Sequence, residues 1–379
     1  MSYILPVFYP DILLSLPVKS LLRFRCLSKS FCSQIDSPDF VKMHLQKSIA
    51  TGSRRNLVFS CLEDLYISDF DTGLVEATRL STPFAAPNME TTICGYCNGM
   101  ILSTVGPLHE VRRRPLELVL WNPFCRKLKR LPVCPATTTP NHVTRNCSLG
   151  YDWVTDDYKV VLISDVSDVT SEVWVFSLKS NSWDMRQELP HDNGIDTFGS
   201  YSNGALYWEL TVTKSFEISG FDLANEHFFR LPNICLSEDG QLRRDFSYLK
   251  MAVVDGYVHR LKLPFSPQVQ EFYFYDTRNG GIGVGVWRKA FTFEQEEDDS
   301  ALSCCLPLAY SKDGNAVLFR DGLDELFWYN LEMKTIRKVD FPAMPQNTCS
   351  GSFVCLETLV SPCYFDEMRD VDLELRLGI

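Results

Sequence analysis

The sequence predicts an α+β protein of mainly β structure, in which a short N-terminal unit of three helices precedes a β-propeller-like domain of about six blades. Two observations predict this fold class. The first 45 residues combine helical, basic and apolar character, and the remainder repeats with a period of roughly 40–50 residues. With 379 residues and 45% hydrophobic content, the chain can bury a large core.

The N-terminal unit carries two apolar stripes at helical spacing. The residues on the stripes are Ile12, Leu13, Leu16, Leu21, Leu22 and Cys26. Pro17 suits the first position of a helix, because its missing N–H would have no partner there. A unit close to the roughly 40-residue limit for independent folding cannot bury both stripes internally. We therefore expect another protein to cover part of this surface.

Charge is distributed unevenly along the chain. Residues 1–50 carry a net +3 and the remainder −14, which gives −11 overall. The basic clusters Arg112–Arg114 and Lys127–Arg130 are too small to form a nucleic-acid surface. The sequence thus argues against nucleic-acid binding and favours an acidic partner for the N-terminal unit.

The apolar start of the chain does not resemble a secretory signal. Pro6, Pro10 and Asp11 interrupt it, and no small-residue cleavage pattern follows. No other apolar run approaches the roughly 18–20 residues that span a bilayer, so we expect no membrane insertion. Without export, the 14 cysteines are expected to be reduced and mostly buried. These features indicate a location in the cytoplasm or nucleus.

Aromatic residues recur at 45- to 55-residue intervals through the remainder of the chain. They are Phe70, Trp121, Phe176, Phe221, Tyr275 and Tyr329. Turn dipeptides precede the last five, at Asn98–Gly99, Asp156–Asp157, Asn203–Gly204, Asp255–Gly256 and Asp313–Gly314. Such dipeptides favour the positive φ of tight hairpins. The pattern therefore predicts repeated antiparallel units.

Each repeat has room for about four short strands, as in a propeller blade. In the third repeat these strands are predicted at Ser148–Tyr151, Tyr158–Ile163, Glu172–Leu178 and Ser182–Arg186. The last strand, Gly351–Val360, is expected to return and complete the first blade. An irregular pair of β-sandwiches with accidental spacing is the alternative.

No residue pattern indicates catalysis, a cofactor or a metal. The six histidines lack the spacing of a metalloprotease helix. Cys94 and Cys97 have zinc-knuckle spacing without a second close pair, so buried thiols are the preferred interpretation over zinc. The acidic run Glu294–Asp299 is interpreted as a solvated loop. Asp71, Asp222 and Asp276, which follow three of the aromatic repeats, are expected to cap turns.

Several ordered motifs resemble a known family. The stretches Asp11–Leu13, Leu16–Leu21, Lys29–Phe31 and Ile35–Phe40 resemble the F-box of plant F-box proteins. The remainder resembles the F-box-associated, kelch-like domain. Its matching stretches are Gly95–Gly99, Leu120–Lys127, Gly150–Asp152, Asp156–Val161, Phe176–Trp183, Asn203–Trp208 and Leu359–Pro362. Leu5–Pro6 stands eleven residues before Leu16–Pro17, where the family has twelve, so the first helix is expected to be short.

The resemblance implies a non-catalytic substrate receptor of an SCF-type ubiquitin ligase. Residues 1–47 would form the F-box, residues 55–362 the propeller and residues 363–379 a C-terminal tail. The F-box would bind a Skp-family adaptor and, through it, a cullin. The implied adaptor-binding residues are Ile12, Leu13, Leu16, Pro17, Leu21, Leu22, Phe24, Arg25, Cys26, Ser28 and Lys29. Lys19 and Arg23 would join Arg25 and Lys29 as a basic rim.

Within the family, Asp64–Asp71 and Leu326–Leu331 look most like members that repress constitutive defence-gene expression, which implies an immune receptor as the target. Pollen self-incompatibility F-box receptors share the architecture and stay open as an alternative. A β-propeller enzyme, or a scaffold without ligase association, is the alternative from another class. Target choice is expected to lie in inter-strand loops. These loops are Gly106–Pro115, Pro135–Arg145, Ser164–Ser171 and Glu294–Ser300.

Overall fold

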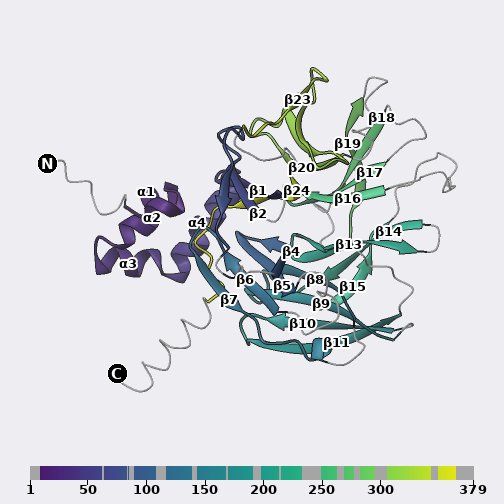
Figure 1. Ribbon diagram of the computed structural model, residues 1–379, viewed down its shortest axis with the longest axis horizontal. Coiled ribbons are helices and arrows are strands. Elements are labelled where there is room, and N and C mark those ends of the chain that lie inside the picture. Colours follow the sequence, from purple (N-terminus) through teal and green to yellow (C-terminus); the bar gives the residue numbers. More distant parts are fainter. Residues whose placement is uncertain are drawn as a thin grey trace.

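The structure, a computed structural model, consists of a group of short helices beside a β-propeller (Figure 1). It describes residues 9–61, 64–82, 84, 89–107, 117–138, 143–167, 170–190, 198–212, 215–232, 249–262, 269–276, 282–294, 305–342 and 349–363. The acidic run at 295–299 and nearly all of the predicted tail lie outside these residues.

Four helices form the N-terminal part, one more than the sequence predicts. They are α1 (Tyr9–Ser15), α2 (Val18–Arg25), α3 (Lys29–Ile35) and α4 (Pro38–Thr51). The extra helix arises because two serines restart the helical backbone: Ser28 accepts a hydrogen bond from the N–H of Phe31, and Ser37 from that of Phe40. Helix α4 ends at Gly52, whose φ of 55° suits glycine. We call residues 9–52 the helical module.

The described strands form six four-stranded antiparallel sheets, which are the blades of the propeller. The first three sheets contain β24 (Ser350–Leu356), β1 (Arg55–Cys61), β2 (Asp64–Asp69) and β3 (Thr78–Leu80); β4 (Met89–Cys97), β5 (Met100–Pro107), β6 (Glu117–Asn122) and β7 (Lys127–Arg130); and β8 (Val143–Asp152), β9 (Asp157–Ser167), β10 (Thr170–Ser177) and β11 (Ser182–Pro190). The predicted mainly β fold with six blades is confirmed.

The other three sheets follow the same order along the chain. They contain β12 (Ser200–Ser202), β13 (Ala205–Val212), β14 (Ser215–Asp222) and β15 (His227–Arg230); β16 (Leu249–Val254), β17 (Tyr257–Lys262), β18 (Val269–Asp276) and β19 (Val286–Glu294); and β20 (Leu306–Tyr310), β21 (Ala316–Arg320), β22 (Leu326–Asn330) and β23 (Ile336–Lys338). The four strands predicted in the third repeat correspond to β8–β11, each longer than expected.

The repeated aromatic residues occupy equivalent positions in all six blades. Each lies in, or directly after, the third strand of its blade, and none is more than 4% exposed. Trp121 shows the reason for this constancy: it packs between neighbouring sheets with Val58 and Phe353 of the first blade. A large ring at this position fills the wedge between adjacent blades, so the period in the sequence follows from packing.

The last strand closes the ring by pairing with the first blade. In β24, Phe353 stands opposite Val58 and Val354 opposite Leu57 of β1. The predicted closing segment is correct in its role but shorter than expected, because the strand ends at Leu356. We call residues 357–363, which leave the sheet at this point, the C-terminal strap.

Strand direction divides the connections between two ends of the propeller. In every blade the first–second and third–fourth turns share one end, here called the proximal end. The second–third and inter-blade connections share the other, the distal end. The predicted hairpins Asn98–Gly99, Asn203–Gly204 and Asp255–Gly256 lie at the proximal end, and both residues of each have positive φ.

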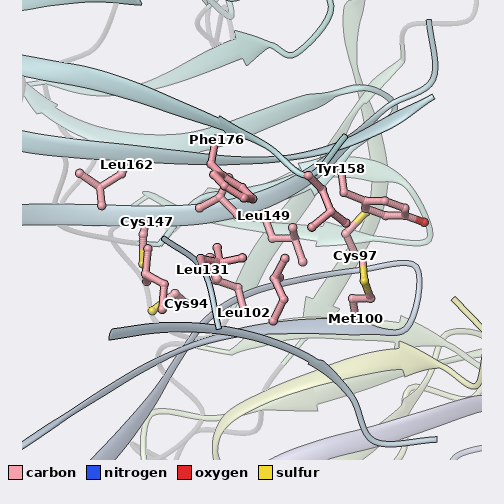
Figure 2. Close-up of a cluster of buried hydrophobic side chains, with 14 of the residues drawn as sticks. Cys94, Cys97, Met100, Leu102, Leu131, Cys147, Leu149, Tyr158, Leu162 and Phe176 are labelled. Atoms are coloured by element: carbon pink, nitrogen blue, oxygen red, sulfur yellow. The ribbon is translucent and has the colours of Figure 1, made fainter. Parts of the chain in front are cut away.

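The cysteines predicted as buried thiols lie in the propeller core. Cys94, Cys97 and Cys147 project into one apolar cluster between the second and third blades (Figure 2). The hydrogen bond with Cys94 and burial together raise the pKa of Cys147, and burial raises that of Cys97. Cys97 and Cys147 therefore stay protonated at physiological pH, and all three cysteines pack as small core side chains.

Candidate functional site

The helical module is fixed to the proximal end of the propeller. Leu45 of α4 is buried in the same apolar cluster as Met100 and Leu149. Nearby, Lys42 Nζ lies 3.1 Å from Asp156 Oδ2 in the turn between β8 and β9. Helix α4 is therefore part of both the module and the propeller core, and the two units cannot rotate freely about each other.

The C-terminal strap passes between the module and the blades, where the yellow segment runs beside α4 (Figure 1). Leu359 joins the module's core cluster with Leu13 and Phe40. On the propeller side, the amide of Asn122 donates to the carbonyl oxygens of Thr358 at 3.1 Å and Val360 at 2.8 Å. The strap therefore ties the module to the second blade directly after ring closure.

Glu357 of the strap completes α2. The N-cap of α2 is Pro17, which offers no side-chain cap, and the Glu357 carboxyl accepts hydrogen bonds from the N–H groups of Val18 and Lys19 instead. Burial raises the pKa of Glu357, and these two hydrogen bonds oppose the rise. A carboxylate at this position also suits the positive end of the helix dipole.

The predicted adaptor-binding residues fall into three groups by exposure. Leu13 and Leu21 are buried, so they shape the module from within and do not reach its surface. The half-buried residues are Leu16, Leu22, Phe24 and Arg25, and the exposed ones are Ile12, Pro17, Cys26, Ser28 and Lys29. Leu27, missed by the sequence analysis, is 68% exposed directly after α2. The sequence signal that could have revealed Leu27 is an apolar residue placed between the basic residues Arg25 and Lys29.

Arg25 has a structural partner within the module. Its Nε lies 2.7 and 2.8 Å from the two carboxylate oxygens of Asp36, in the link between α3 and α4. The hydrogen bond with Asp36 raises the pKa of Arg25. Arg25 therefore braces the module, while Lys19, Arg23 and Lys29 of the predicted basic rim are exposed.

The four loops expected to choose a target all connect strands at the distal end. Large parts of them, including 108–116, 139–142 and 295–300, lie outside the described residues. Two corrections apply to the rest. Pro135–Thr138 forms a single 3-10 turn with Ala136 buried, and most of Ser164–Ser171 belongs to β9 and β10. Target recognition by this end stays a prediction.

Of the three carboxylates expected to cap turns, Asp222 does so. Asp222 accepts hydrogen bonds from the N–H groups of Ala224 and Asn225 at 2.9 and 3.2 Å. Asp71 instead accepts from the N–H of Arg54, because this longer-range partner is nearer to it. Asp276 pairs with Arg288, and since residues 277–281 lie outside the described residues, its turn-capping role stays a prediction. Among the described residues, no three His, Cys, Asp or Glu side chains are grouped closely enough to hold a metal ion.

Two buried histidines make stability depend on pH. Burial lowers the pKa of His44 and of His259 to about 4, and the His44 ring lies 3.0 Å from the Leu16 carbonyl oxygen. Unfolded histidine titrates near 6.5, so on acidification the unfolded chain binds protons first and the folded state loses stability between about pH 6.5 and 4. We expect the free energy of unfolding to fall by about 2 kcal/mol per histidine between pH 7 and pH 5.

Urea unfolding of His44→Gln at both pH values tests this prediction. In this variant, the fall in the free energy of unfolding between pH 7 and pH 5 should be smaller by the contribution of His44. His227→Gln provides the matched control because His227 is exposed on β15. Equal pH dependence in the two variants would contradict the assignment.

The geometry defines a class of protein: a small helical module fixed to one end of a six-bladed propeller. The F-box domain family matches residues 10–43, which lie within the module. The family described as "F-box associated beta propeller domain" matches residues 52–242, just over half of the chain. This chain therefore belongs to the F-box proteins that carry an F-box-associated β-propeller.

Curated relatives agree with this assignment over most of the chain. F-box protein CPR1 of Arabidopsis thaliana is 29% identical over 88% of this chain and 84% of its own length. F-box protein At4g22390 of the same plant is 26% identical over 94% of this chain and 90% of its own length. Among solved structures, an oligogalacturonate lyase from Vibrio parahaemolyticus has a TM-score of 0.44 with 9% identity, over 77% of this chain and 76% of the lyase. A likeness of that size carries no information about activity.

None of the described helices is long and apolar enough to cross a membrane.

Proposed function

We propose that this chain is the substrate-recognition subunit of an SCF-type ubiquitin ligase. Its F-box would bind a Skp-family adaptor, and through it a cullin, while the propeller captures a protein for ubiquitination and degradation. The chain itself would be non-catalytic. The main support is the fixed attachment of the F-box at the proximal end, through Leu45, Glu357 and Leu359. A rigid connection lets one molecule hold an adaptor and a target at a constant separation.

The proposal predicts that exposed apolar side chains of the F-box contact the adaptor. Ile12 is 44% exposed on α1 and Leu27 is 68% exposed after α2. Buried apolar anchors commonly contribute about 2 kcal/mol or more each to an interface. The double variant Ile12→Asp, Leu27→Asp should therefore lose adaptor binding by at least about a hundredfold. Co-purification with a Skp-family adaptor, followed by titration, measures the loss.

A matched control separates docking from folding. Met43 on α4 is also 44% exposed, as Ile12 is, and Met43→Asp makes one apolar-to-aspartate replacement of the same kind outside the predicted contact residues. This variant should bind the adaptor normally. Equal loss in both proteins, or no loss in the double variant, would refute the placement of the interface. Failure of the unmodified chain to bind any adaptor would instead favour the scaffold or enzyme alternatives.

We further propose an intracellular immune receptor as the target, with the complex acting in the cytoplasm or nucleus. The support is the resemblance of Asp64–Asp71 and Leu326–Leu331 to defence-regulating family members and the 29% identity to F-box protein CPR1. Identification of the proteins that co-purify with the chain from plant cells tests this choice. Capture of pollen-pistil recognition proteins would favour the self-incompatibility alternative.

A further inference from the structure

A cavity opens at the proximal end, between the F-box and the propeller axis. Its volume is about 940 Å³, within the roughly 300–1,000 Å³ typical of small-molecule sites. Lys42, Gln46 and Ile49 of α4 form one wall, and the proximal turns of several blades, including Asn203 and Lys312, form the others. This cavity lies away from the distal loops and from the predicted adaptor-binding residues.

Aromatic side chains line much of this cavity. They are Tyr96, Tyr151, Trp153, Tyr201, Tyr207 and Tyr275. Trp153 stands at the rim with 63% of its surface exposed, although it is a large apolar side chain. Tyr207 and Tyr275 are 2% exposed and Tyr96 stacks on Phe353. The ring surface open to a flat apolar molecule therefore comes from Trp153 and the half-buried Tyr151 and Tyr201. The exposure of Trp153 shows that part of this surface is unoccupied by the chain itself.

The charges in the cavity are mainly positive, although the chain as a whole is acidic. The charged lining residues are Lys42, Arg55, Asp255 and Lys312. Lys312 is exposed at the mouth. The one carboxyl among these lining residues is Asp255. Burial raises the pKa of Asp255, and the nearby Arg55 charge opposes the rise. Lys42 is paired with Asp156, and Arg55 lies 3.6 Å from Asp71. Lys312 has no ion-pair partner among the described residues, so it is the lining cation best placed to attract an anion.

Arg55 is a buried cation with incomplete hydrogen bonding. It is only 7% exposed, and its Nη1 donates to the Tyr310 carbonyl oxygen at 2.7 Å. Its Nε has no hydrogen-bond partner among the described residues, although Asp71 Oδ1 lies 3.6 Å away as an ion-pair partner and the Phe70 ring lies 4.4 Å from the guanidinium carbon. A buried guanidinium with an unused donor is costly unless an anion approaches it. This second observation also points to an anionic ligand.

We propose that this cavity binds a small organic anion that has a flat apolar body. The aromatic walls contact the body of the ligand, while Arg55 and Lys312 attract its negative group. Because α4 contributes one wall, the bound molecule contacts both the F-box and the propeller. The described lining residues include none of the predicted adaptor-binding residues and none of the distal loops.

Two fluorescent probes with one ring system test the proposal on the full chain. Anilinonaphthalene sulfonate carries a negative group, whereas phenylnaphthylamine has nearly the same rings without it. We expect saturable, one-to-one binding of the sulfonate and weaker binding of the neutral probe. Lys312→Glu should weaken binding of the sulfonate by about three- to tenfold and leave the affinity for the neutral probe nearly unchanged. Trp153→Ala should weaken both probes.

Arg337→Glu is the control for charge, because Arg337 is exposed on the outer strand β23, away from the cavity. It should leave both affinities unchanged. Since Lys312 and Arg337 are both on the surface, thermal transitions of the two variants should match that of the unmodified chain. Equal binding of the two probes, or equal effects of the two charge reversals, would overturn the proposal.

Discussion

A chain that ends before Ser350 should fail to fold and should aggregate when expressed. The truncation removes β24, which pairs with β1 and closes the first blade. It also removes the strap, whose backbone oxygens hold Asn122 and whose Leu359 fills the F-box core. An open ring exposes the unpaired edge of β1, and such edges associate with one another.

The expected size of this effect follows from the side chains that lose their burial partners. Phe353, Cys355, Leu359 and Val360 are each at most 8% exposed. Burial of one large apolar side chain contributes about 1.5–3 kcal/mol, so the losses at Phe353, Leu359 and Val360 alone approach the whole stability of a typical domain, about 5–15 kcal/mol. We therefore expect loss of the cooperative thermal transition, which calorimetry of the soluble fraction would measure.

A chain that ends at Cys363 is the matched control. It keeps β24 and the strap and removes only the predicted tail. This protein should remain soluble with a thermal transition close to that of the full chain. If the chain lacking β24 remains monomeric with an unchanged transition, ring closure by this strand does not stabilise the fold.

The repeat could be predicted from the sequence because every blade packs against its neighbour in the same way. A ring in the third strand, as at Trp121 or Phe221, fills the space against the next blade, and the hairpin residues Asn203–Gly204 adopt positive φ. Both requirements act on short stretches of chain, so they leave local signals. The same holds for Ser37, whose side chain accepts a hydrogen bond from the N–H of Phe40 at the start of α4.

The attachment of the F-box could not be predicted in this way. It depends on contacts between residues more than 200 positions apart, such as Asn122 with Val360. No local period marks such pairs. For the same reason, Leu13 and Leu21 were assigned to the adaptor surface: apolar periodicity identifies a helix face that is buried, but does not say whether the strap or another protein covers it.

The contacts of α4 determine where the F-box can be removed while the propeller core is kept intact. A chain that begins at Ser37 keeps α4, including Leu45 in the propeller core and Lys42 beside Asp156. It lacks α1–α3 and with them the predicted adaptor-binding residues. The blades keep their own clusters, for example the one around Trp208 and Phe221, so we expect this protein to fold.

In plant cells, this shortened chain should capture the same proteins as the full chain, and their half-lives should lengthen several-fold. Target binding persists because the distal end is unchanged, whereas degradation stops because no adaptor can dock. The double variant Ile12→Asp, Leu27→Asp should have the same effect with the F-box still in place. A cycloheximide chase of the captured proteins measures both.

A chain that begins at Gln46 provides the contrast, because it also loses Leu45 and Lys42. It should unfold at a lower temperature, since loss of a buried leucine typically costs about 2–5 kcal/mol. Reduced capture by that chain alone would therefore report propeller damage and leave the proposed ligase role intact. If the chain beginning at Ser37 captures its proteins and their half-lives do not change, the propeller is a scaffold, and the F-box does not connect it to degradation.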